Sequence, residues 1–395
     1  MSIKNDCKDI YYFDNNATTL VYDNSVKDEI NEWISCGNPS NILHQLGKQS
    51  FNKIEQCREI IAKDTNCNPE NVIFTSCATE SNNLIINSIL KSQEDTRFSI
   101  LTTTFEHPSV INIYKRLEEK GINVIYVMPC VDKTDPEYAR VKTSHIETAI
   151  KSARYPVVLM SVMFANNEIG SVQDIEAIGQ IARKYNIYFH CDGTQAIGKF
   201  KIDILHLNVD AFVFSGHKFH APKGIGCIVH SGNKKLTGLF IGGKQEDGVR
   251  PGTENVAFIA GMTKALEIAH TDRTDKNMFV AKLKNWIIEN MKTYINIQVI
   301  KSDDKYMLPN TIFVILNDLQ TCNRKFVEQL GKQNICVSMG SACQTSSESS
   351  HVLDAVGITK DYRSKIIRIS LSDYTTFNEC RYLVVNIIQL VKTMK

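Results

Sequence analysis

The chain has 395 residues, of which 43% are hydrophobic and 22% are charged, and its formal net charge is +2. A length above roughly 250–300 residues favours one large and one smaller domain. The ordinary composition and near-neutral charge argue against an electrostatic binder of nucleic acid or of a membrane surface. No apolar run approaches the ~18 residues that a membrane-spanning helix needs.

The N-terminal sequence and the cysteine spacing bear on the cellular compartment of the protein. Residues 1–9 lack the apolar core of a signal peptide and are too acidic for a typical transit peptide, so we expect a cytoplasmic protein. The twelve cysteines form no Cys-x-x-Cys pair and show no metal-ligand spacing. We therefore expect reduced thiols and no metal site.

The first two-thirds of the chain has an alternating pattern. Residues 10–13 predict a short strand, followed by a polar turn at 14–19 and helices at 25–34 and 45–63. Strands are then expected at 72–74, 98–101, 124–127, 157–164, 187–189 and 211–214, with helices from 79, 108, 144 and 175. This alternation predicts a mostly parallel, doubly wound α/β sheet. The segment 224–230 follows too closely for a crossover helix, so it is expected to pair antiparallel.

The remainder has the pattern of a smaller α+β domain. A helix is expected at 256–269, and the charged stretch 271–276 is the expected domain boundary. Beyond it the pattern predicts helices at 279–291, from 324 and from 378, and strands at 298–300, 311–315, 335–338 and 366–371. We expect an arm at 1–15 that packs on the small domain, a large domain at 16–270 and the small domain at 271–395.

The most informative stretch is 211–218, where an apolar strand ends in a hydroxyl, an imidazole and an amine. Ligand sites of open α/β sheets lie at the carboxyl ends of strands. A lysine desolvated there falls below its usual pKa of about 10.4 and becomes a nucleophile able to form a Schiff base. Taken alone, Lys218 would more simply be a surface lysine.

Polar clusters follow four other strands of this domain in the same way. They lie at 75–80, 106–108, 166–170 and 190–195. Parallel strands would bring all of them, together with 215–218, to one edge of the sheet, where a cofactor would sit.

These groups meet the requirements of pyridoxal phosphate. Lys218 supplies an amine for its aldehyde, and Asp192 could pair with a protonated ring nitrogen. Backbone N–H groups before the helix at 79, with the Thr79 hydroxyl, suit a phosphate. Ser215 and His217 add donors to this set. For Asp192 and Thr79 alone, a helix N-cap is the simpler role.

Three further side chains suit the ring of the same cofactor. His107 could stack on the ring or donate to it, although a structural histidine is the simpler role when it is taken alone. Asn167 and Gln195 suit hydrogen bonds to the ring hydroxyl.

In this order and spacing, the segments resemble the NifS/IscS cysteine desulfurases of the class V, fold-type I pyridoxal phosphate enzymes. The matching segments extend over almost the whole chain: 14–19, 37–40, 74–83, 106–107, 166–170, 192–195, 215–218, 242–253, 340–343 and Arg368. The resemblance implies a large cofactor-binding domain with a mostly parallel, seven-stranded type of sheet and a smaller α+β C-terminal domain that carries a catalytic cysteine loop.

The resemblance also implies roles for single residues. Lys218 binds the cofactor covalently, His107 stacks on the ring and assists proton transfer, and Asp192 pairs with the pyridine nitrogen. Asn167 and Gln195 address the ring oxygen. The phosphate site is matched by Ala78, Thr79, Ser215, Gly216 and His217, and Thr253 would complete it from the other subunit of a homodimer with a shared active site.

In the second domain, Cys343 matches the residue that accepts the sulfur, and Arg368 matches the one that, with Asn167, binds the substrate. Arg368 interrupts an apolar strand, and a charge there needs an anionic partner, either the substrate carboxylate or a structural carboxylate. The flanks of Cys343 are small and flexible, which would let its thiolate travel between the cofactor and an acceptor.

The implied activity converts L-cysteine to L-alanine and leaves a persulfide on Cys343. An iron–sulfur scaffold, a tRNA thiolation enzyme and a DNA phosphorothioation system all stay open as the acceptor, and no direct nucleic-acid or membrane contact is expected. A selenocysteine lyase or another class V aminotransferase is an alternative for which Cys343 would be optional. A silent subunit of a sulfur-transfer assembly is a second alternative, against which the joint presence of Lys218, Asp192, Arg368 and Cys343 argues.

Several positions depart from the family pattern. Cys77 replaces a glycine beside the phosphate site, which is tolerable if its backbone is helical. Cys191 and Gly193 are unusual neighbours of Asp192, and residues 370–373 read Ser-Leu-Ser-Asp where Ser-Leu-Gly-Arg is usual. The long C-terminal tail with which IscS-type enzymes contact their scaffold is expected to be absent after the last helix, which leaves the partner open.

Overall fold

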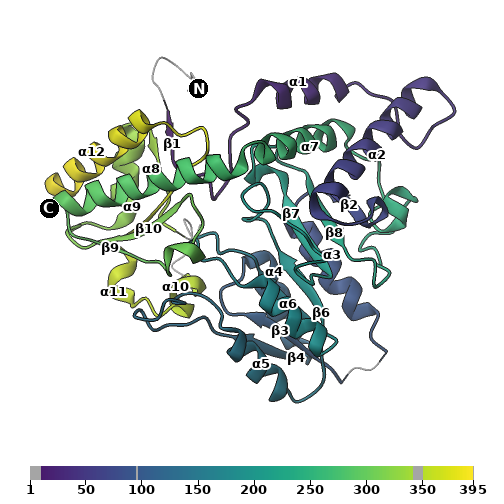
Figure 1. Cartoon of the computed structure of the whole chain (residues 1–395), viewed down its shortest axis with the longest axis horizontal. Coiled ribbons are helices and arrows are strands. Elements are labelled where there is room, and N and C mark those ends of the chain that lie inside the picture. The colour runs from purple at the N-terminus through teal and green to yellow at the C-terminus, as the bar shows by residue number, and fades with distance from the viewer. Residues whose placement is uncertain (1–9, 95–96, 341–349, 395) are drawn as a thin grey trace.

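The computed structural model describes residues 10–94, 97–340 and 350–394. A seven-stranded sheet forms the centre of the larger lobe, in the order β2-β8-β7-β6-β5-β3-β4 (Figure 1). Its strands are β2 (Val72–Thr75), β3 (Ser99–Thr103), β4 (Asn123–Val127), β5 (Val157–Met163), β6 (Tyr188–Asp192), β7 (Ala211–Ser215) and β8 (Gly226–His230).

The strand directions bring the polar clusters to one edge of the sheet. β8 is antiparallel to both β2 and β7, whereas the pairs from β7 through β6, β5 and β3 to β4 are parallel. Because β8 is antiparallel to both of its neighbours, β2 and β7 run in the same direction. The carboxyl ends of β2, β3, β5, β6 and β7 therefore share one edge, and the mostly parallel α/β sheet with an antiparallel β8 is confirmed.

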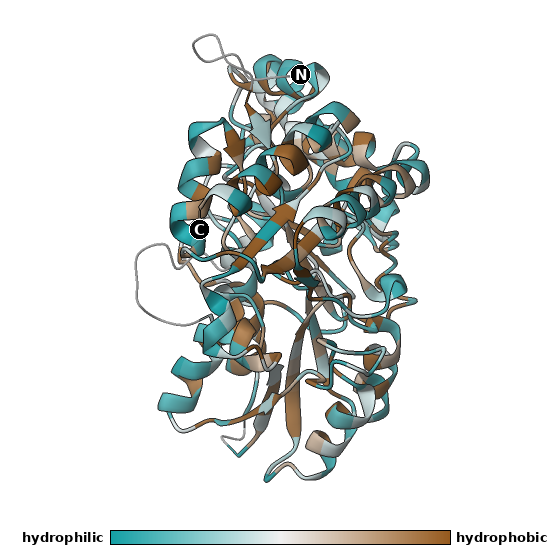
Figure 2. Cartoon of the chain, turned by 90° about the vertical axis from the view of Figure 1, so that its left-hand side faces the viewer, coloured by the Kyte–Doolittle hydropathy of each residue, from teal (hydrophilic) through white to brown (hydrophobic). Residues whose placement is uncertain are grey.

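Helices cover both faces of this sheet. They are α1 (Asn24–Trp33), α2 (Gln45–Thr65), α3 (Ala78–Lys91), α4 (Pro108–Glu119), α5 (Thr143–Lys151), α6 (Ile175–Lys184) and α7 (Val256–His270). Successive strand residues enter opposite cores because side chains alternate along a strand. In β7, Ala211 and Val213 pack in the core that includes α3 and α4, and Phe212 and Phe214 pack in the core on the other face. Figure 2 shows these apolar strands inside a shell of more polar helices.

The smaller lobe is built on an antiparallel sheet in the order β12-β10-β9. Its strands are β9 (Ile297–Val299), β10 (Thr311–Leu316) and β12 (Ile366–Ser370), and its helices are α8 (Arg273–Tyr294), α9 (Asn323–Lys332), α10 (His351–Ala355), α11 (Lys360–Arg363) and α12 (Phe377–Thr393). Residues of α8, α9 and α12 form a separate core with this sheet.

The N-terminal segment starts in the smaller lobe and leads to the edge of the large sheet. β1 (Tyr11–Tyr12) pairs in parallel with β11 (Ile335–Cys336), and Phe13 lies in the smaller lobe's core. Asp14 forms an isolated bridge with Ser370, and the Thr19 amide donates to the carbonyl oxygen of His217. The segment therefore links the end of β12 to the residues that follow β7.

The structure differs from expectation at the charged stretch 271–276. Only Thr271 and Asp272 separate α7 from α8, which begins at Arg273 rather than at 279. The charged side chains make tertiary contacts: Arg273 donates to the Phe200 carbonyl oxygen at 2.9 Å, and Lys276 to that of Ile268 at 2.6 Å. The division into an arm and two domains stays a prediction.

Two features are absent from the part of the chain that the structure describes. None of their helices is both long and apolar enough to cross a membrane. Nor do the described side chains include a group of three or more His, Cys, Asp or Glu that could hold a metal ion.

Candidate active site

A cavity of about 210 Å³ lies at the carboxyl edge of the large sheet. Its lining includes Ala78, Thr79, His107, Asn167, Asp192, Gln195, Ser215, His217 and Lys218. The polar clusters that follow β2, β3, β5, β6 and β7 thus meet at one place. Gly216, Thr253 and Arg368 do not line the cavity, and Cys343 lies outside the described residues.

Lys218 is held at the cavity by the N-terminal segment. Its Nζ donates to the carbonyl oxygens of Asn16 at 2.7 Å and Ala17 at 2.9 Å. Desolvation lowers the pKa of Lys218 to about 7, and the positive charges of Arg368 and Lys199 act in the same direction. A large fraction of Lys218 is therefore a neutral, nucleophilic amine near pH 7.

Asp192 ends β6 and is buried. Its carboxylate accepts hydrogen bonds from the Asn82 side chain and from the Thr194 amide, both at 3.0 Å. Both donors are neutral, so the negative charge stays available to a cationic partner such as a protonated ring nitrogen. Asn82 belongs to α3 and also donates to Ser109 at 2.9 Å, which fixes its amide against the carboxylate.

The start of α3 suits a phosphate. Its N-cap residue, Cys77, makes no side-chain capping bond. Cys77 has φ −177°, an extended backbone that any residue adopts, so a side chain is tolerated here without strain although the backbone is not helical. The Ser215 hydroxyl, which lines the same cavity, is buried without a hydrogen-bond partner in the described structure. An uncapped helix N-terminus and an unpartnered hydroxyl together fit an anion.

His107 and Gln195 border the cavity from two different segments. His107 caps α4, and its Nδ1 accepts from the Ser109 amide at 3.1 Å. The His107 side chain is exposed, but partial desolvation still lowers its pKa, and the Lys218 charge acts in the same direction. Gln195 donates to the Asn16 carbonyl oxygen at 3.0 Å, and its Oε1 is buried without a partner among the described residues.

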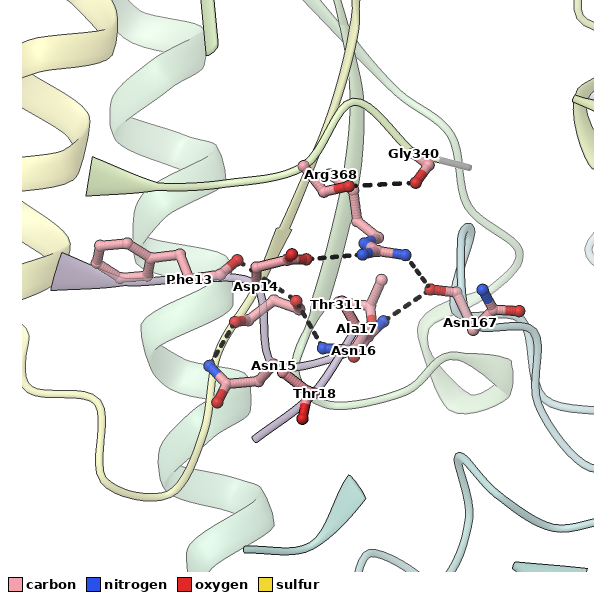
Figure 3. Close-up of polar contacts among 12 residues, drawn as sticks. Phe13, Asp14, Asn15, Asn16, Ala17, Thr18, Asn167, Thr311, Gly340 and Arg368 are labelled. Carbon is pink, nitrogen blue, oxygen red and sulfur yellow. Dashed lines mark hydrogen bonds and ion pairs between the residues drawn. The ribbon is translucent and has the colours of Figure 1, made fainter. Parts of the chain in front are cut away.

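Arg368 forms a buried ion pair with Asp14 beside the cavity (Figure 3). Its Nη2 donates to Asp14 Oδ1 at 2.7 Å, and its Nη1 donates to the Asn167 carbonyl oxygen at 2.9 Å. The anionic partner expected of this arginine is thus a carboxylate of the chain itself. Asp14 lies in the segment 14–19 that resembles the family, but no role could be predicted for it from the sequence.

Glu106 is a second residue whose environment the sequence did not reveal. It is fully buried, and its Oε1 accepts from the Thr103 hydroxyl at 2.7 Å and from the Met163 amide at 2.9 Å. Burial raises the pKa of Glu106 to about 8. The carboxyl group is therefore mostly protonated at neutral pH, directly before His107 in the chain.

The residues on either side of 341–349 are attached near the cavity. Ser338 and Arg368 exchange backbone hydrogen bonds at 2.7 and 3.0 Å, and Gly340 accepts from the Ser338 hydroxyl at 3.2 Å. On the other side, Ser350 donates to Glu168 Oε2 at 3.1 Å, and His351 Nε2 lies 2.8 Å from the Glu106 carbonyl oxygen. Both flanks of Cys343 are therefore fixed next to Asn167 and His107.

Thr253 is exposed on a loop that packs at the start of α3. Arg250 in this loop pairs with Glu80 at 3.0 Å. Glu246 pairs with Arg58 through two contacts at 2.9 and 3.0 Å and accepts from the Phe74 amide at 2.9 Å. These contacts hold the loop firmly while leaving Thr253 turned to the surface.

The residues at the cavity fit pyridoxal phosphate. Lys218 offers an amine of lowered pKa, Asp192 offers a buried carboxylate, and the start of α3 offers an anion site. The unpartnered Gln195 Oε1 and Ser215 hydroxyl are buried polar atoms that a ligand would satisfy.

The chain is similar to proteins of one family over most of its length. The family described as aminotransferase class-V matches residues 11–383. A cysteine desulfurase of Nostoc sp. is 35% identical over 372 residues, which cover 93% of this chain and 89% of that protein. Cysteine desulfurase IscS of Methanosarcina thermophila is 36% identical, with 92% and 88% covered. A solved structure described as a NifS-like protein has a TM-score of 0.87 at 33% identity, covering 97% of this chain and 99% of that one.

Proposed function

Because the chain belongs to the class V aminotransferase family and is a pyridoxal phosphate-dependent cysteine desulfurase, we propose that it forms a persulfide on Cys343. In this reaction L-cysteine becomes L-alanine, and the sulfur then passes to an acceptor protein for iron–sulfur cluster assembly or for thiolation of tRNA or DNA. The fold is that of the fold-type I enzymes.

The attachment of both flanks of Cys343 beside the cavity is the observation that carries the proposal. Gly340 is the last described residue before Cys343, and three residues extend the chain by at most about 10–11 Å. Gly340 lies two residues after Ser338, whose backbone pairs with that of Arg368. This position supports the proposal that the thiol of Cys343 serves both the cavity and an acceptor.

Each cavity residue has a proposed role in holding the cofactor. Bound pyridoxal phosphate supplies an aldehyde that reacts with amines and a ring that stabilises negative charge at the substrate Cα. Asp192 would pair with the protonated ring nitrogen, His107 would stack on the ring, and Asn167 and Gln195 would hydrogen-bond the ring hydroxyl. The phosphate would be held by Ala78, Thr79, Ser215, Gly216 and His217.

The proton and sulfur transfers use three residues. The neutral Lys218 amine would remove the Cα proton, and His107, whose pKa is lowered, would assist proton transfer. The Cys343 thiolate attacks the substrate sulfur, so that an S–S bond forms and the C–S bond breaks. The electron pair of the C–S bond remains with the substrate carbon, which takes up a proton to become the methyl group of alanine. Arg368 holds the substrate carboxylate.

A homodimer with a shared site is part of the proposal. Thr253 is exposed and does not line the cavity of its own chain, which supports a role in the partner's phosphate site. Leu43 and Ile241 are almost fully exposed, and a second copy of the chain would cover such apolar side chains.

All cysteines of the described residues are free, which supports the proposed cytoplasmic location because thiols stay reduced there.

Cys343→Ser tests the persulfide step. The variant should bind pyridoxal phosphate normally, because the groups at the cavity are unchanged. Alanine formation from cysteine should fall by at least about a hundredfold, because an alcohol is a far weaker nucleophile toward sulfur than a thiolate. Cys322→Ser, at an exposed cysteine, is the matched control. Mass spectrometry should find the added sulfur on the peptide that contains residue 343. Undiminished alanine formation from cysteine in the variant would rule out the persulfide mechanism, and efficient activity on selenocysteine alone would favour a selenocysteine lyase.

A further inference from the structure

Arg368 is almost completely buried, whereas its partner Asp14 keeps contact with solvent. The Arg368 side chain is 4% exposed and that of Asp14 is 24% exposed. A buried guanidinium needs an anion at all times, since an unpaired buried charge costs several kcal/mol. A partly exposed carboxylate can instead return to water. The pair is therefore asymmetric: Asp14 can be replaced by another carboxylate, but Arg368 cannot be left without one.

The backbone fixes Asp14 within reach of Arg368. Asp14 bridges to Ser370, two residues beyond Arg368 on β12, and the Asn15 amide donates to the Ser370 carbonyl oxygen at 3.3 Å. The Tyr12 hydroxyl donates to the Asp14 carbonyl oxygen at 3.2 Å. The position of Asp14 follows from pairing within the smaller lobe and does not depend on a ligand.

The ion pair holds the guanidinium at a position that does not line the cavity. Neither Arg368 nor Asp14 lines the cavity, whereas Asn167 does, and its carbonyl oxygen accepts from Arg368. Figure 3 shows the guanidinium between this carbonyl group and the Asp14 carboxylate. Arg368 Nε is buried without a partner in the described structure, so the arginine has donor capacity left for a better arrangement.

We propose that Asp14 is a specificity-determining residue that occupies Arg368 until the substrate carboxylate displaces it. The inference rests on the proposed role of Arg368 in carboxylate binding. When the α-carboxylate of cysteine arrives, Asp14 is hydrated and the guanidinium turns toward the cavity, so one buried ion pair replaces another. A ligand without a carboxylate leaves the Asp14–Arg368 pair intact. Asp14 thus weakens the binding of every carboxylate and leaves ligands that bind through an amine alone unaffected.

Asp14→Asn tests the proposal, because it keeps the shape of the side chain and removes the competing charge. The probes are 3-mercaptopropionate, which has a carboxylate but no amine, and cysteamine, which has an amine but no carboxylate. Titration calorimetry on the holoenzyme should find 3-mercaptopropionate bound about tenfold more tightly than by the unmodified protein, the effect expected for loss of one competing charged hydrogen bond. Cysteamine affinity should change less than about twofold.

Asp174→Asn is the matched control, since it removes a carboxylate that only caps α6 and asparagine caps equally well. Asp14→Ser is a second variant, should Asp14→Asn fold poorly, and a thermal shift by 3-mercaptopropionate measures binding independently of activity. Unchanged or weaker binding of 3-mercaptopropionate, or an equal gain for cysteamine, would overturn the inference. Arg368→Gln separates it from the proposed function: if that variant bound 3-mercaptopropionate as tightly as the unmodified protein, the role proposed for Arg368 would itself be wrong.

Discussion

Lys218 is the cavity residue whose protonation matters most for taking up the cofactor. Desolvation lowers its pKa from 10.5 to about 7. We predict that the apoprotein captures pyridoxal phosphate roughly tenfold faster at pH 8 than at pH 6, following the neutral fraction of an amine with that pKa. Absorbance of the covalently bound cofactor measures the rate. Nα-acetyl-lysine, whose rate should keep rising toward pH 10, is the reference, and a flat profile for the protein would contradict the shift.

The same pKa shift changes the stability of the apoprotein. Between pH 7 and 10.5 the unfolded chain keeps a proton on Lys218 that the folded chain has lost. The free energy of unfolding therefore rises with pH across this window on account of this group.

Glu106 should act in the opposite direction. Its pKa rises from 4.5 in the unfolded chain to about 8 in the fold, so between these values only the folded state holds the proton. The free energy of unfolding should fall as pH rises through this window, by at most about 1.4 kcal/mol per pH unit. Glu106→Gln cannot ionise and keeps the acceptor for Thr103 and Met163. Urea unfolding at pH 5, 6.5 and 8 should show a shallower fall for this variant, and parallel curves would refute the assignment.

Some site residues could be predicted from the sequence, whereas the contacts of others could not. Lys218 and Asp192 could be predicted because each belongs to a polar cluster at the end of an apolar run, and parallel strands bring such clusters together. The need of Arg368 for an anion was also predictable from its apolar neighbours. Its partner was not, because Asp14 is 354 residues away in the sequence and no periodic pattern connects the two.

At the scale of the strands, a side chain of the neighbouring β7 explains why position 193 is a glycine. A Cβ atom on Gly193 would lie 1.8 Å from the Phe212 ring, so this unusual neighbour of Asp192 matches a large side chain on the next strand. Gly193→Ala should destabilise the protein by roughly 1–3 kcal/mol through overpacking. Denaturant unfolding would measure the loss, and Phe212→Leu in the same chain should restore part of it.

Gly331 provides the comparison for this substitution. It lies inside α9, and a Cβ atom there would meet nothing within 4 Å. Gly331→Ala should therefore stabilise the protein by about 0.5–1 kcal/mol, because alanine loses less backbone entropy in a helix. Equal effects of the two substitutions would mean that contact with Phe212 is not what excludes a side chain at Gly193.

Helices and strands were predictable as types, but their ends depended on neighbours. β6 was expected to end at 189, yet it continues to Asp192 because Cys191 and Asp192 pair with residues of β5 and β7. Residues 335–338 were expected to form a strand, and only Ile335 and Cys336 do so, in a two-stranded sheet with the N-terminal segment. Polar residues at a strand end look like a loop until the strands beside them are known.

At the scale of the whole molecule, the proposed shared site can be tested with mixed dimers. Lys218→Ala and Thr253→Ala homodimers should each be weakly active, since each lacks one part of both sites. After subunit exchange, one site of a mixed dimer carries both lesions and the other carries neither. About half of the sites in mixed dimers should therefore regain alanine formation. Exchange verified by mass, without any regain, would rule out a contribution of Thr253 to the partner's site.

The pairing of the N-terminal segment with β12 also determines which parts of the fold can form first during translation. Asn15 and its hydrogen-bond partner Ser370 are separated by 355 residues. At about 5–20 residues per second, the ribosome needs roughly 20–70 s to make the second after the first. The large sheet can assemble during that interval, but Asp14 and Asn16 have no strand to join until translation is nearly complete. The nascent chain can therefore complete its large sheet before Asn16, whose carbonyl oxygen accepts from Lys218, is fixed in place.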